Sequence, residues 1–502
     1  MMKGFQKMNK NPYQPSRRTL LKGAAALTSS AILPGALSRP SLAAAPPLKL
    51  RVDTRTIEVK GKAAKVFGIF NEAGGHGINK VFDGRFAVEL TNALQEETMV
   101  HWHGLAPPVT MDGTPMLSGP PLKPGETVTY DFPSRVAGTH WMHSHVGLQE
   151  QQMLAAPLII RESATPLVDE QEHVVMLHDF TFRSPEDILA ELKGGGGAHA
   201  AHSMAGGNMA GMDHSKMDHS EMQMGGGMGM GGAMTNDIIY DAFLANDRTL
   251  DDPEVVRAEK GGLFRLRVIN ASAASNMWID LGEISGELIA VDGQSIHPHR
   301  ASRFPIAIAQ RADIRLQLPK ASGAWPVLFK AEGSTGQSGI ILVAGDGAVA
   351  KISDQGEMQP AIGLEMEAQL RAMGKISDTA VSRVEMLMLT GGGSDYAWGL
   401  NGMSSMHDVL FSVREGERYQ VMFHNMTSMA HPMHLHGHYF KVVNINGTAI
   451  DGALRDTVLV PVDGMVTIQF DADNPGTWAF HCHHLYHMNA GMMGAIAYQN
   501  AA

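Results

Sequence analysis

The 502-residue sequence has almost no cysteine, since Cys482 is the only one. A single cysteine excludes an intrachain disulfide, so the fold must rest on hydrophobic cores in any redox compartment. Charged residues make up only 18% of the chain, and the formal net charge is −11, which argues against nucleic acid as a partner. Because the one cysteine stands between two histidines, chemistry explains it better than an inert buried thiol does.

Beyond its N-terminal segment the sequence also lacks an apolar run long enough to cross a membrane. Near the N-terminus, a twin arginine at 17–18 precedes a short apolar run from Gly23 to Leu33 and then three alanines at 43–45. These features in this order predict a signal peptide over residues 1–45. We therefore expect a periplasmic protein that is exported by the twin-arginine machinery and is not inserted in the membrane after signal removal. We also expect it to be a monomer.

Short alternating runs separated by glycine and proline, such as 86–90 and 127–132, predict an all-β sandwich. The pattern returns twice, because residues 124–132 are echoed by 311–318 and by 463–470. Each run is followed by a strand that begins with glycine and contains tryptophan. The sequence therefore predicts three copies of one sandwich.

We place the three domains at residues 48–162, 170–345 and 384–502. The linker at 346–383 contains apolar residues among charged ones, and Lys351 to Lys375 favours a short helix. Only the first and third copies carry paired histidines. The middle copy is therefore predicted to act as a spacer without a metal ion of its own.

An insertion of different composition interrupts the middle copy at about 194–234. It contains nine methionines and four histidines, partly in a repeat of five residues. A solvated linker is the simpler interpretation. Soft thioethers and imidazoles at regular spacing favour capture of Cu(I), and we prefer this interpretation. The residues of the repeat are Met212, His214, Met217, His219 and Met222.

The cysteine lies between His481 and His483. On a strand, alternate side chains face opposite ways, so these two histidines share one face and Cys482 points to the other. His487 and Met492 follow at intervals of five residues. A thiolate, an imidazole and a thioether fit a blue-copper site with the methionine as weak axial ligand. One further histidine must come from elsewhere.

Four histidine pairs, each spaced two residues apart, supply the remaining ligands. Both imidazoles of a pair face the same way on a strand. Eight imidazoles in one cleft between two domains suffice for three metal ions. His431 has the opposite parity to His434 and so turns towards the face of Cys482. The pairs are His101 and His103, His143 and His145, His434 and His436, and His481 and His483.

An isolated buried histidine is more often a hydrogen-bonded core residue than a ligand, but four pairs around His-Cys-His outweigh that alternative. The sequence resembles the multicopper oxidases, the family of laccases, ascorbate oxidase, bilirubin oxidase and bacterial periplasmic cuprous oxidases. It carries the motifs H-x-H-G, W-x-H-x-H, H-P-x-H-x-H-G and H-C-H-x3-H-x4-M. The resemblance covers the chain after the signal. It implies three consecutive cupredoxin-like Greek-key β-sandwich domains and four copper ions.

The resemblance also implies a division of the ligands. The type 1 copper would be bound by His431, Cys482 and His487, with Met492 axial. The type 2 copper would be bound by His101 and His434. The type 3 pair would be bound by His103, His143 and His483 on one ion and by His145, His436 and His481 on the other.

Two carboxylates are singled out in the same way. Asp112 matches an acidic residue that relatives use near the type 2 copper, so the resemblance implies a proton relay, although an Asp-Gly turn explains it nearly as well. Some cuprous oxidases place a second carboxylate where this chain has Met488. Asp456 is expected to be a structural carboxylate near the type 1 face.

Three functions are compatible with this ligand set. The first is a cuprous oxidase, in which Cu(I) gives its electron through Cys482 to O2, serving copper tolerance. Met429 matches a substrate-copper methionine of the bacterial enzymes, although Thr427 stands where those enzymes have aspartate. The second is a laccase that oxidises phenols or aromatic amines at the edge of His487. The third, a protein that only binds copper, is disfavoured because every ligand position is filled.

Overall fold

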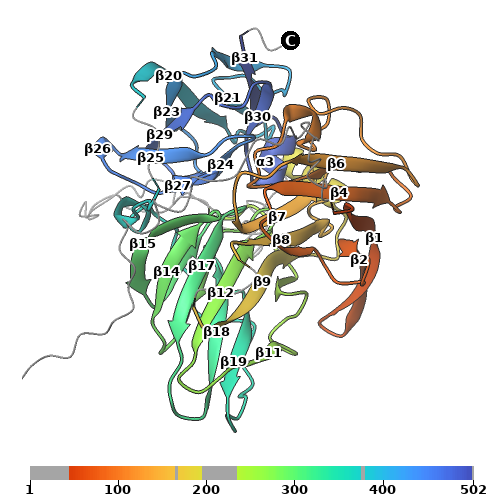
Figure 1. Cartoon of the computed structure of the whole chain (residues 1–502), viewed down its shortest axis with the longest axis vertical. Coiled ribbons are helices and arrows are strands. Elements are labelled where there is room, and N and C mark those ends of the chain that lie inside the picture. Colours follow the sequence, from red (N-terminus) through yellow and green to blue (C-terminus); the bar gives the residue numbers. More distant parts are fainter. Residues whose placement is uncertain (1–44, 164–167, 195–234, 375–378, 500–502) are drawn as a thin grey trace, which may run out of the picture. The chain divides into compact units, whose positions relative to one another are not determined.

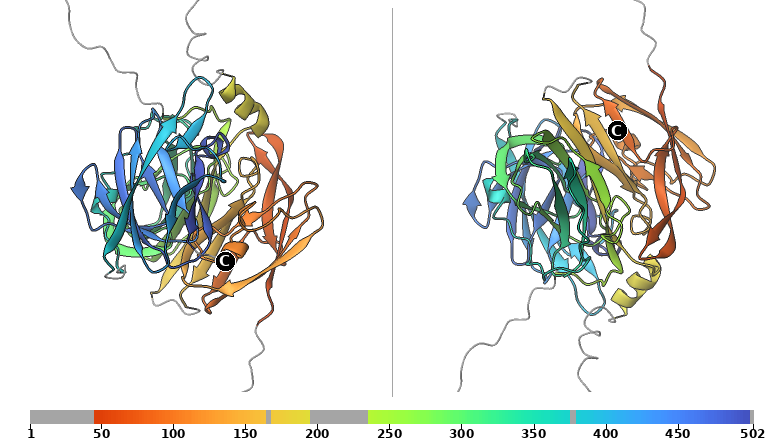
Figure 2. Two further views of the ribbon diagram at one scale, coloured as in Figure 1. Left: turned by 90° about the horizontal axis from the view of Figure 1, so that it is seen from above. Right: turned by 90° about the horizontal axis from the view of Figure 1, so that it is seen from below.

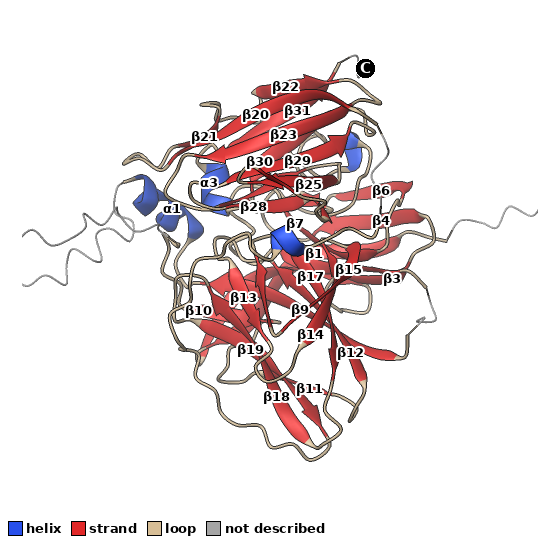
Figure 3. Cartoon of the chain, turned by 90° about the vertical axis from the view of Figure 1, so that its left-hand side faces the viewer, coloured by secondary structure: helices blue, strands red, loops and turns tan. Residues whose placement is uncertain are grey.

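The computed structural model describes residues 45–163, 168–194, 235–374 and 379–499. Strands make up 51% of the described residues and helices only 5%, which confirms the predicted all-β class (Figure 3). Within the described ranges, no helix is both long and apolar enough to span a membrane. The predicted signal, apart from Ala45, and the repeat of the insertion lie outside the described residues.

The first sandwich, orange in Figure 1, packs two sheets around a core that includes Phe86 and Trp102. These two rings meet edge to face with centroids 4.9 Å apart. One sheet has the order β2 (Lys62–Asn71), β1 (Leu48–Val59), β4 (Arg85–Asn92) and β6 (Thr127–Pro133). The other has the order β3 (Ile78–Val81), β8 (Ala155–Arg161), β7 (Gly138–Ser144) and β5 (Val100–His101).

The middle sandwich, green in Figure 1, has its own core of buried aliphatic and aromatic side chains, with Phe304 and Phe329 fully buried. One sheet has the order β10 (Ala242–Ala245), β9 (Glu170–Phe180), β12 (Leu263–Asn270), β17 (Arg311–Gln317), β14 (Gly286–Val291) and β15 (Gln294–Ala301). The other has the order β11 (Glu254–Arg257), β19 (Gln337–Ala344), β18 (Gly323–Ala331), β13 (Met277–Asp280) and β16 (Arg303–Ile306).

The third sandwich, blue in Figures 1 and 2, lies beside the first. One sheet has the order β21 (Trp398–Leu400), β20 (Val381–Gly391), β23 (Arg418–Asn425), β29 (Met465–Asp471), β25 (Phe440–Ile445) and β26 (Thr448–Ala449), with β27 (Leu454–Arg455) also paired to β25. The other has the order β22 (Val409–Val413), β31 (Met493–Tyr498), β30 (Thr477–Cys482), β24 (His431–Leu435) and β28 (Thr457–Val460).

One pairing pattern occurs in all three sandwiches. The first strand of each pairs in parallel with a later one: β1 with β4, β9 with β12, and β20 with β23. In each second sheet an antiparallel hairpin recurs, formed by β7 and β8, β18 and β19, and β30 and β31. The last strand of each hairpin also has a parallel partner, β3, β11 or β22. This repetition agrees with the predicted three copies of one fold.

The middle copy lacks the ligands that the same strand carries in the other two. Counted from the glycine before each tryptophan strand, the histidine pairs of β7 and β30 come five and seven residues later. In β18 these positions are Leu328 and Lys330. Lys330 Nζ lies 2.6 Å from Asp280 Oδ2. An ion pair therefore occupies the place of a ligand in the middle sandwich.

The described helices are short. Of the short helix predicted between Lys351 and Lys375, the described residues 351–374 form only the single 3-10 turn η2 (Glu367–Gln369). The helix α1 (Pro185–Lys193) begins after Ser184, whose side chain accepts a hydrogen bond from the backbone N–H of Asp187. Ile188 of α1 packs into the core of the third sandwich. Hydrophobic docking therefore fixes this helix at the start of the insertion.

Candidate metal centres

The four histidine pairs all straddle the end of a strand. The first histidine of each pair lies within β5, β7, β24 or β30, and the second lies just beyond the strand end. The expectation that both members sit on a strand therefore holds for the first histidine only. Both members still point into the space between the first and third sandwiches, because the ligand atoms from the first sandwich and those from the third lie close together there.

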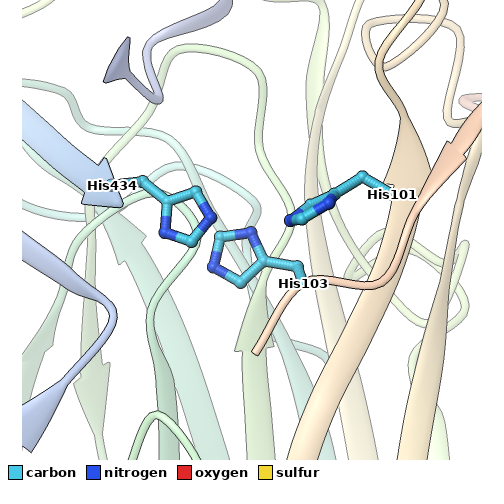
Figure 4. Close-up of side chains that lie close together, drawn as sticks. All are labelled: His101, His103 and His434. Atoms are coloured by element: carbon cyan, nitrogen blue, oxygen red, sulfur yellow. The ribbon is translucent and has the colours of Figure 1, made fainter. Parts of the chain in front are cut away.

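The eight imidazoles form three groups, two of which share His103, and within each group all ligand atoms lie within 4.8 Å of one another. Figure 4 shows one group, in which His101 and His103 of the first sandwich face His434 of the third. The rings of His103 and His434 stack with centroids 3.8 Å apart. The groups are His101, His103 and His434; His103, His143 and His483; and His145, His436 and His481.

Most of these rings use Nδ1 for a contact with the protein and leave Nε2 for a metal. Nδ1 of His101 and of His434 donates to the backbone oxygens of Asp112 and Asp456, each at 2.8 Å. Nε2 of both histidines is buried and has no protein partner among the described residues. A neutral imidazole that donates through Nδ1 presents a lone pair at Nε2. The arrangement therefore fits metal ions at the centre of the cluster.

His103 is turned the other way. Its Nε2 lies 3.1 Å from Oδ1 of Asp456, and its buried Nδ1 has no protein partner in the described part of the chain. Asp456 is held in turn by Arg311 of the middle sandwich, whose Nη1 lies 2.9 Å from the same oxygen. The expectation that Asp456 lies near the type 1 face is thus wrong. It precedes β28, which pairs with the strand that carries His434.

Burial favours the neutral form of several cluster histidines. It lowers the pKa of His143, His434 and His483 well below the ordinary value, and the neighbouring imidazoles lower it further. For His481 the same burial lowers the pKa to about 3. Neutral imidazoles bind metal ions without first losing a proton.

Asp112 lies at this cluster, directly after η1 (Val109–Met111). Its Oδ2 accepts a hydrogen bond from His436 Nδ1 at 2.8 Å and another from the Thr114 hydroxyl at 2.7 Å. Its backbone oxygen contacts His101. Asp112 therefore touches one histidine of each sandwich, and its side chain is only 2% exposed.

Glu150 is a second carboxylate at the cluster, and the sequence analysis missed it. Its Oε2 lies 3.1 Å from His143 Nδ1, and its Oε1 lies 3.7 Å from His483 Nδ1. Burial raises the pKa of Glu150 well above its ordinary value. The only available signal was the polar run Gln149, Glu150 and Gln151, seven residues after His143, which the structure buries.

The second centre lies within the third sandwich. Cys482 Sγ lies 3.6 Å from His431 Nδ1 and 3.9 Å from His487 Nδ1, and the two nitrogens are 3.2 Å apart. His431 begins β24, and His487 belongs to α3 (Leu485–Asn489). Met492 is fully buried in the same hydrophobic cluster as Cys482. These four side chains are the ligand set of a blue-copper site.

The two centres share β30. His481 and Cys482 are neighbours on this strand, and His481 Nδ1 donates to the backbone oxygen of Cys482 at 2.9 Å. The predicted parity holds, because Cys482 groups with His431 whereas His481 groups with His436. A short path of covalent bonds therefore joins the two sets of ligands.

The outer edges of the two imidazoles beside Cys482 are covered by polar groups. Thr427 Oγ1 lies 2.7 Å from Nε2 of His431. Oδ2 of Asp237, from the segment before β10, lies 3.7 Å from Nε2 of His487. The Tyr396 hydroxyl also donates to Asp237. The sequence analysis did not predict Asp237 at this centre, since no ligand motif contains it.

The charge of Asp237 is stabilised by its surroundings. Burial alone would raise its pKa, but His484 and His487 outweigh this and hold the pKa of Asp237 well below its ordinary value. Trp398 stacks on His487 with ring centroids 4.0 Å apart.

Met429, the predicted substrate methionine, is 4% exposed and packs into the hydrophobic core of the third sandwich. The predicted residues of the insertion lie outside the described part of the chain.

Three cupredoxin-like sandwiches, with a Cys-His-His-Met centre and an eight-histidine cluster between the first and third, define a copper redox protein. Three models of multicopper oxidase domains match residues 51–165, 171–345 and 378–502. The chain is 30% identical over 487 residues to the multicopper oxidase MmcO of Mycobacterium tuberculosis, covering 95% of this chain and 91% of that protein. The chain belongs to the multicopper oxidase family.

Other relatives carry different names. Copper resistance protein A of Escherichia coli is 25% identical, with 82% of this chain and 85% of the relative covered. Laccase-2 of Botryotinia fuckeliana is also 25% identical, with 88% and 80% covered. Among solved structures, Fet3p, a multicopper oxidase that functions in iron import, matches with a TM-score of 0.73 at 18% identity, covering 90% of this chain and 91% of that one. The likeness to Fet3p shows the fold alone.

Proposed function

We propose that this multicopper oxidase takes its electrons from Cu(I) and thereby serves copper tolerance. Four Cu(I), one O2 and four protons give four Cu(II) and two waters. When bound, copper supplies the one-electron chemistry at both centres. Relatives named copper resistance protein A support this proposal, but relatives named laccase match over a similar share of the chain.

The observation that carries the proposal is the cover over His487. This imidazole has 0% exposure, and an oxygen of the Asp237 carboxylate lies 3.7 Å from its outer nitrogen. A phenol needs an open apolar edge, but here Trp398 occupies one ring face and Tyr396 is hydrogen-bonded to Asp237. A carboxylate beside the buried edge attracts a small cation more than a neutral aromatic ring. Oxidation of phenols is the second candidate function.

We propose the ligand division that the resemblance implies, with four copper ions. The His-Cys-His-Met centre would hold one ion, and the cluster would hold three. The orientation of His103 supports this division, because its free Nδ1 joins the group of His143 and His483. His101 and His434 then remain for an ion of their own.

The protein residues have separate tasks in this scheme. The peptide bonds around Cys482 connect the electron-accepting centre with His481 and His483. Asp112 holds His436 through Oδ2, and its Oδ1 makes no hydrogen bond in the described ranges and lies 3.4 Å from His101 Nδ1, so the carboxylate is placed to pass protons to the cluster. Glu150 occupies a comparable position on the side of His143.

The direct test is oxygen uptake by the copper-loaded protein with stabilised Cu(I) and, in parallel, with a phenolic donor. We expect fast uptake with Cu(I) and slow uptake with the phenol. Fast uptake with the phenol alone would establish a laccase instead. No uptake from either donor, with copper fully bound, would leave only copper binding.

Asp237→Asn tests the role of the carboxylate at the edge of His487. Removing the charge should raise KM for Cu(I) by roughly tenfold, the equivalent of about 1.4 kcal/mol, and should change KM for a phenol by less than twofold. Asp252→Asn is the matched control, because the Asp252 side chain is 87% exposed. Equal effects on both donors would contradict a cation-specific role.

We also propose export to the periplasm by the twin-arginine route and capture of Cu(I) by the insertion. Replacing Arg17 and Arg18 by lysine should leave the protein in the cytoplasm in a fractionation experiment. Deleting residues 199–234 should slow turnover at low Cu(I) only. Unchanged turnover at every Cu(I) concentration would rule out capture by the insertion.

A further inference from the structure

The outer face of one sheet in the third sandwich carries an unusual set of side chains. β20, β23 and β29 lie side by side there (Figure 1, Figure 3). Leu387, Phe423 and Ile468 point into the core, so the residues next to them in each strand point outward. Five outward positions form what we call the methionine face: Met386, Met388, Met422, His424 and Met465.

Strand register places these side chains in two adjacent rows. Met388 is aligned with His424, which is aligned with Met465 across all three strands. In the next row, Met386 is aligned with Met422. Cross-strand neighbours on one face have Cβ atoms about 4.5–5.5 Å apart. Three soft donors from three strands therefore meet in one row, with two thioethers beside them.

Core packing does not explain these methionines. Met386 is 55% exposed and Met465 is 37% exposed. Solvent-facing sheet positions favour polar or β-branched residues, and methionine is neither. The row on the other side of Met386 returns to that pattern, because Gln469 Nε2 donates to Gln420 Oε1 at 2.9 Å. The soft donors are therefore confined to two rows.

Soft thioether ligands favour Cu(I) among biological metal ions, and imidazole also binds copper. Methionine side chains are flexible enough to converge on one ion from neighbouring strands. The ligands that this sandwich contributes to the two copper centres lie on or next to β24 and β30 of its other sheet and in α3. The methionine face is thus separate from both centres.

We propose that the methionine face binds a soft monovalent cation, Cu(I) or its analogue Ag(I). Met388, His424 and Met465 supply the ligands, and Met386 and Met422 lie beside them as further donors. The site extends the copper chemistry of the protein to a surface outside the oxidase centres. It does not depend on Cu(I) being the electron donor.

The test is protection of methionine sulfur from oxidation in the copper-loaded full-length protein. Ag(I) in chloride-free buffer is the probe, because it donates no electron to the oxidase. Hydrogen peroxide converts free thioethers to sulfoxides, and a sulfur bound to metal is shielded. Peptide mass spectrometry reads each methionine separately. Met116 and Met358 are controls, since they are 61% and 65% exposed and lie outside the methionine face.

We expect Ag(I) at ten times its Kd to slow oxidation of Met388 and Met465 by about tenfold, with the controls unchanged. Equal slowing at the controls, or none at Met388 and Met465, would overturn the proposal. A second measurement uses dialysis against Ag(I). Replacing Met388 and Met465 by leucine should remove one bound Ag(I), whereas replacing Met116 and Met358 by leucine should remove none.

Discussion

The two copper centres share one strand but are built in different ways. The centre of Cys482, His431 and His487 takes all its ligands from the third sandwich. The histidine cluster takes half of its ligands from the first sandwich and half from the third, and carboxylates orient several of them. The first centre therefore depends on the packing of one domain, whereas the cluster depends on the docking of two.

The largest expected effect separates the two centres completely. Cys482→Ser should abolish the blue absorption and reduce donor oxidation to background, because serine replaces the soft thiolate. The histidine cluster should keep its copper, so copper analysis of the variant should show the loss of a single ion. Met492→Leu is the control, for it keeps three strong ligands and should retain a blue absorption with a shifted potential. Loss of all copper in Cys482→Ser would show that the centres are not independent.

Asp112→Asn should damage the cluster and spare the other centre. Removing the charge beside His436 should lower O2 reduction by roughly 10–100-fold. The blue absorption should be unchanged, because Asp112 contacts only cluster histidines. Asp131→Asn, an exposed carboxylate of the same sandwich, serves as control. Turnover within twofold of the wild type would argue for the simple Asp-Gly turn.

Glu150 tests whether one carboxylate ties the two domains together at the cluster. Glu150→Ala removes the carboxylate that lies beside Nδ1 of both His143 and His483 and should weaken copper binding by roughly tenfold. Glu150→Gln keeps an acceptor oxygen and should restore most of the affinity. The measurement is copper content after dialysis against a chelator. An equal loss in both variants would point to a need for the charge rather than for the acceptor.

The smallest effect concerns an interface without metal ligands, between the first and middle sandwiches. Burial lowers the pKa of His178 from 6.5 to about 4. Between these values the unfolded chain binds more protons than the folded one, so stability falls as pH falls. Between pH 6.5 and 5, the free energy of unfolding should fall by roughly 1–2 kcal/mol less in His178→Gln than in the wild type. Urea unfolding of the copper-free protein measures this difference. A wild-type slope in the variant would contradict this origin.

The sequence carried most of the ligand geometry, because strand parity is a local rule. The opposite directions of His481 and Cys482, and the turn of His431 towards Cys482, required only alternation along a strand. Groups that reach the centres from other sandwiches were missed. Asp237 and Glu150 belong to no motif, and tertiary folding brings each beside a histidine far along the chain. Asp237 and His487 are 250 positions apart (487 − 237), and Glu150 and His483 are 333 apart (483 − 150).

Asp456 shows the same limit from another side. Its sequence position after the third histidine pair suggested the type 1 face, yet Arg311 of the middle sandwich holds it against His103. The short helix predicted in the linker between the second and third copies is reduced to one 3-10 turn. Extended linker backbone instead forms hydrogen bonds with residues of the middle sandwich. The backbone N–H of Gly333 donates to Gln359, for example. Contacts of this kind leave no periodic signal in the sequence.

Because the cluster is divided between residues near β5 and residues near β30, its two halves are synthesised at different times. His103 and His483 are 380 positions apart (483 − 103). At about 5–20 residues per second, the ribosome needs roughly 20–75 s to make the second after the first. During that time the imidazoles of the first sandwich lack their partners from the third sandwich and are open to any divalent ion in the cell. Selection of the correct metal must therefore follow completion of the chain, not accompany it.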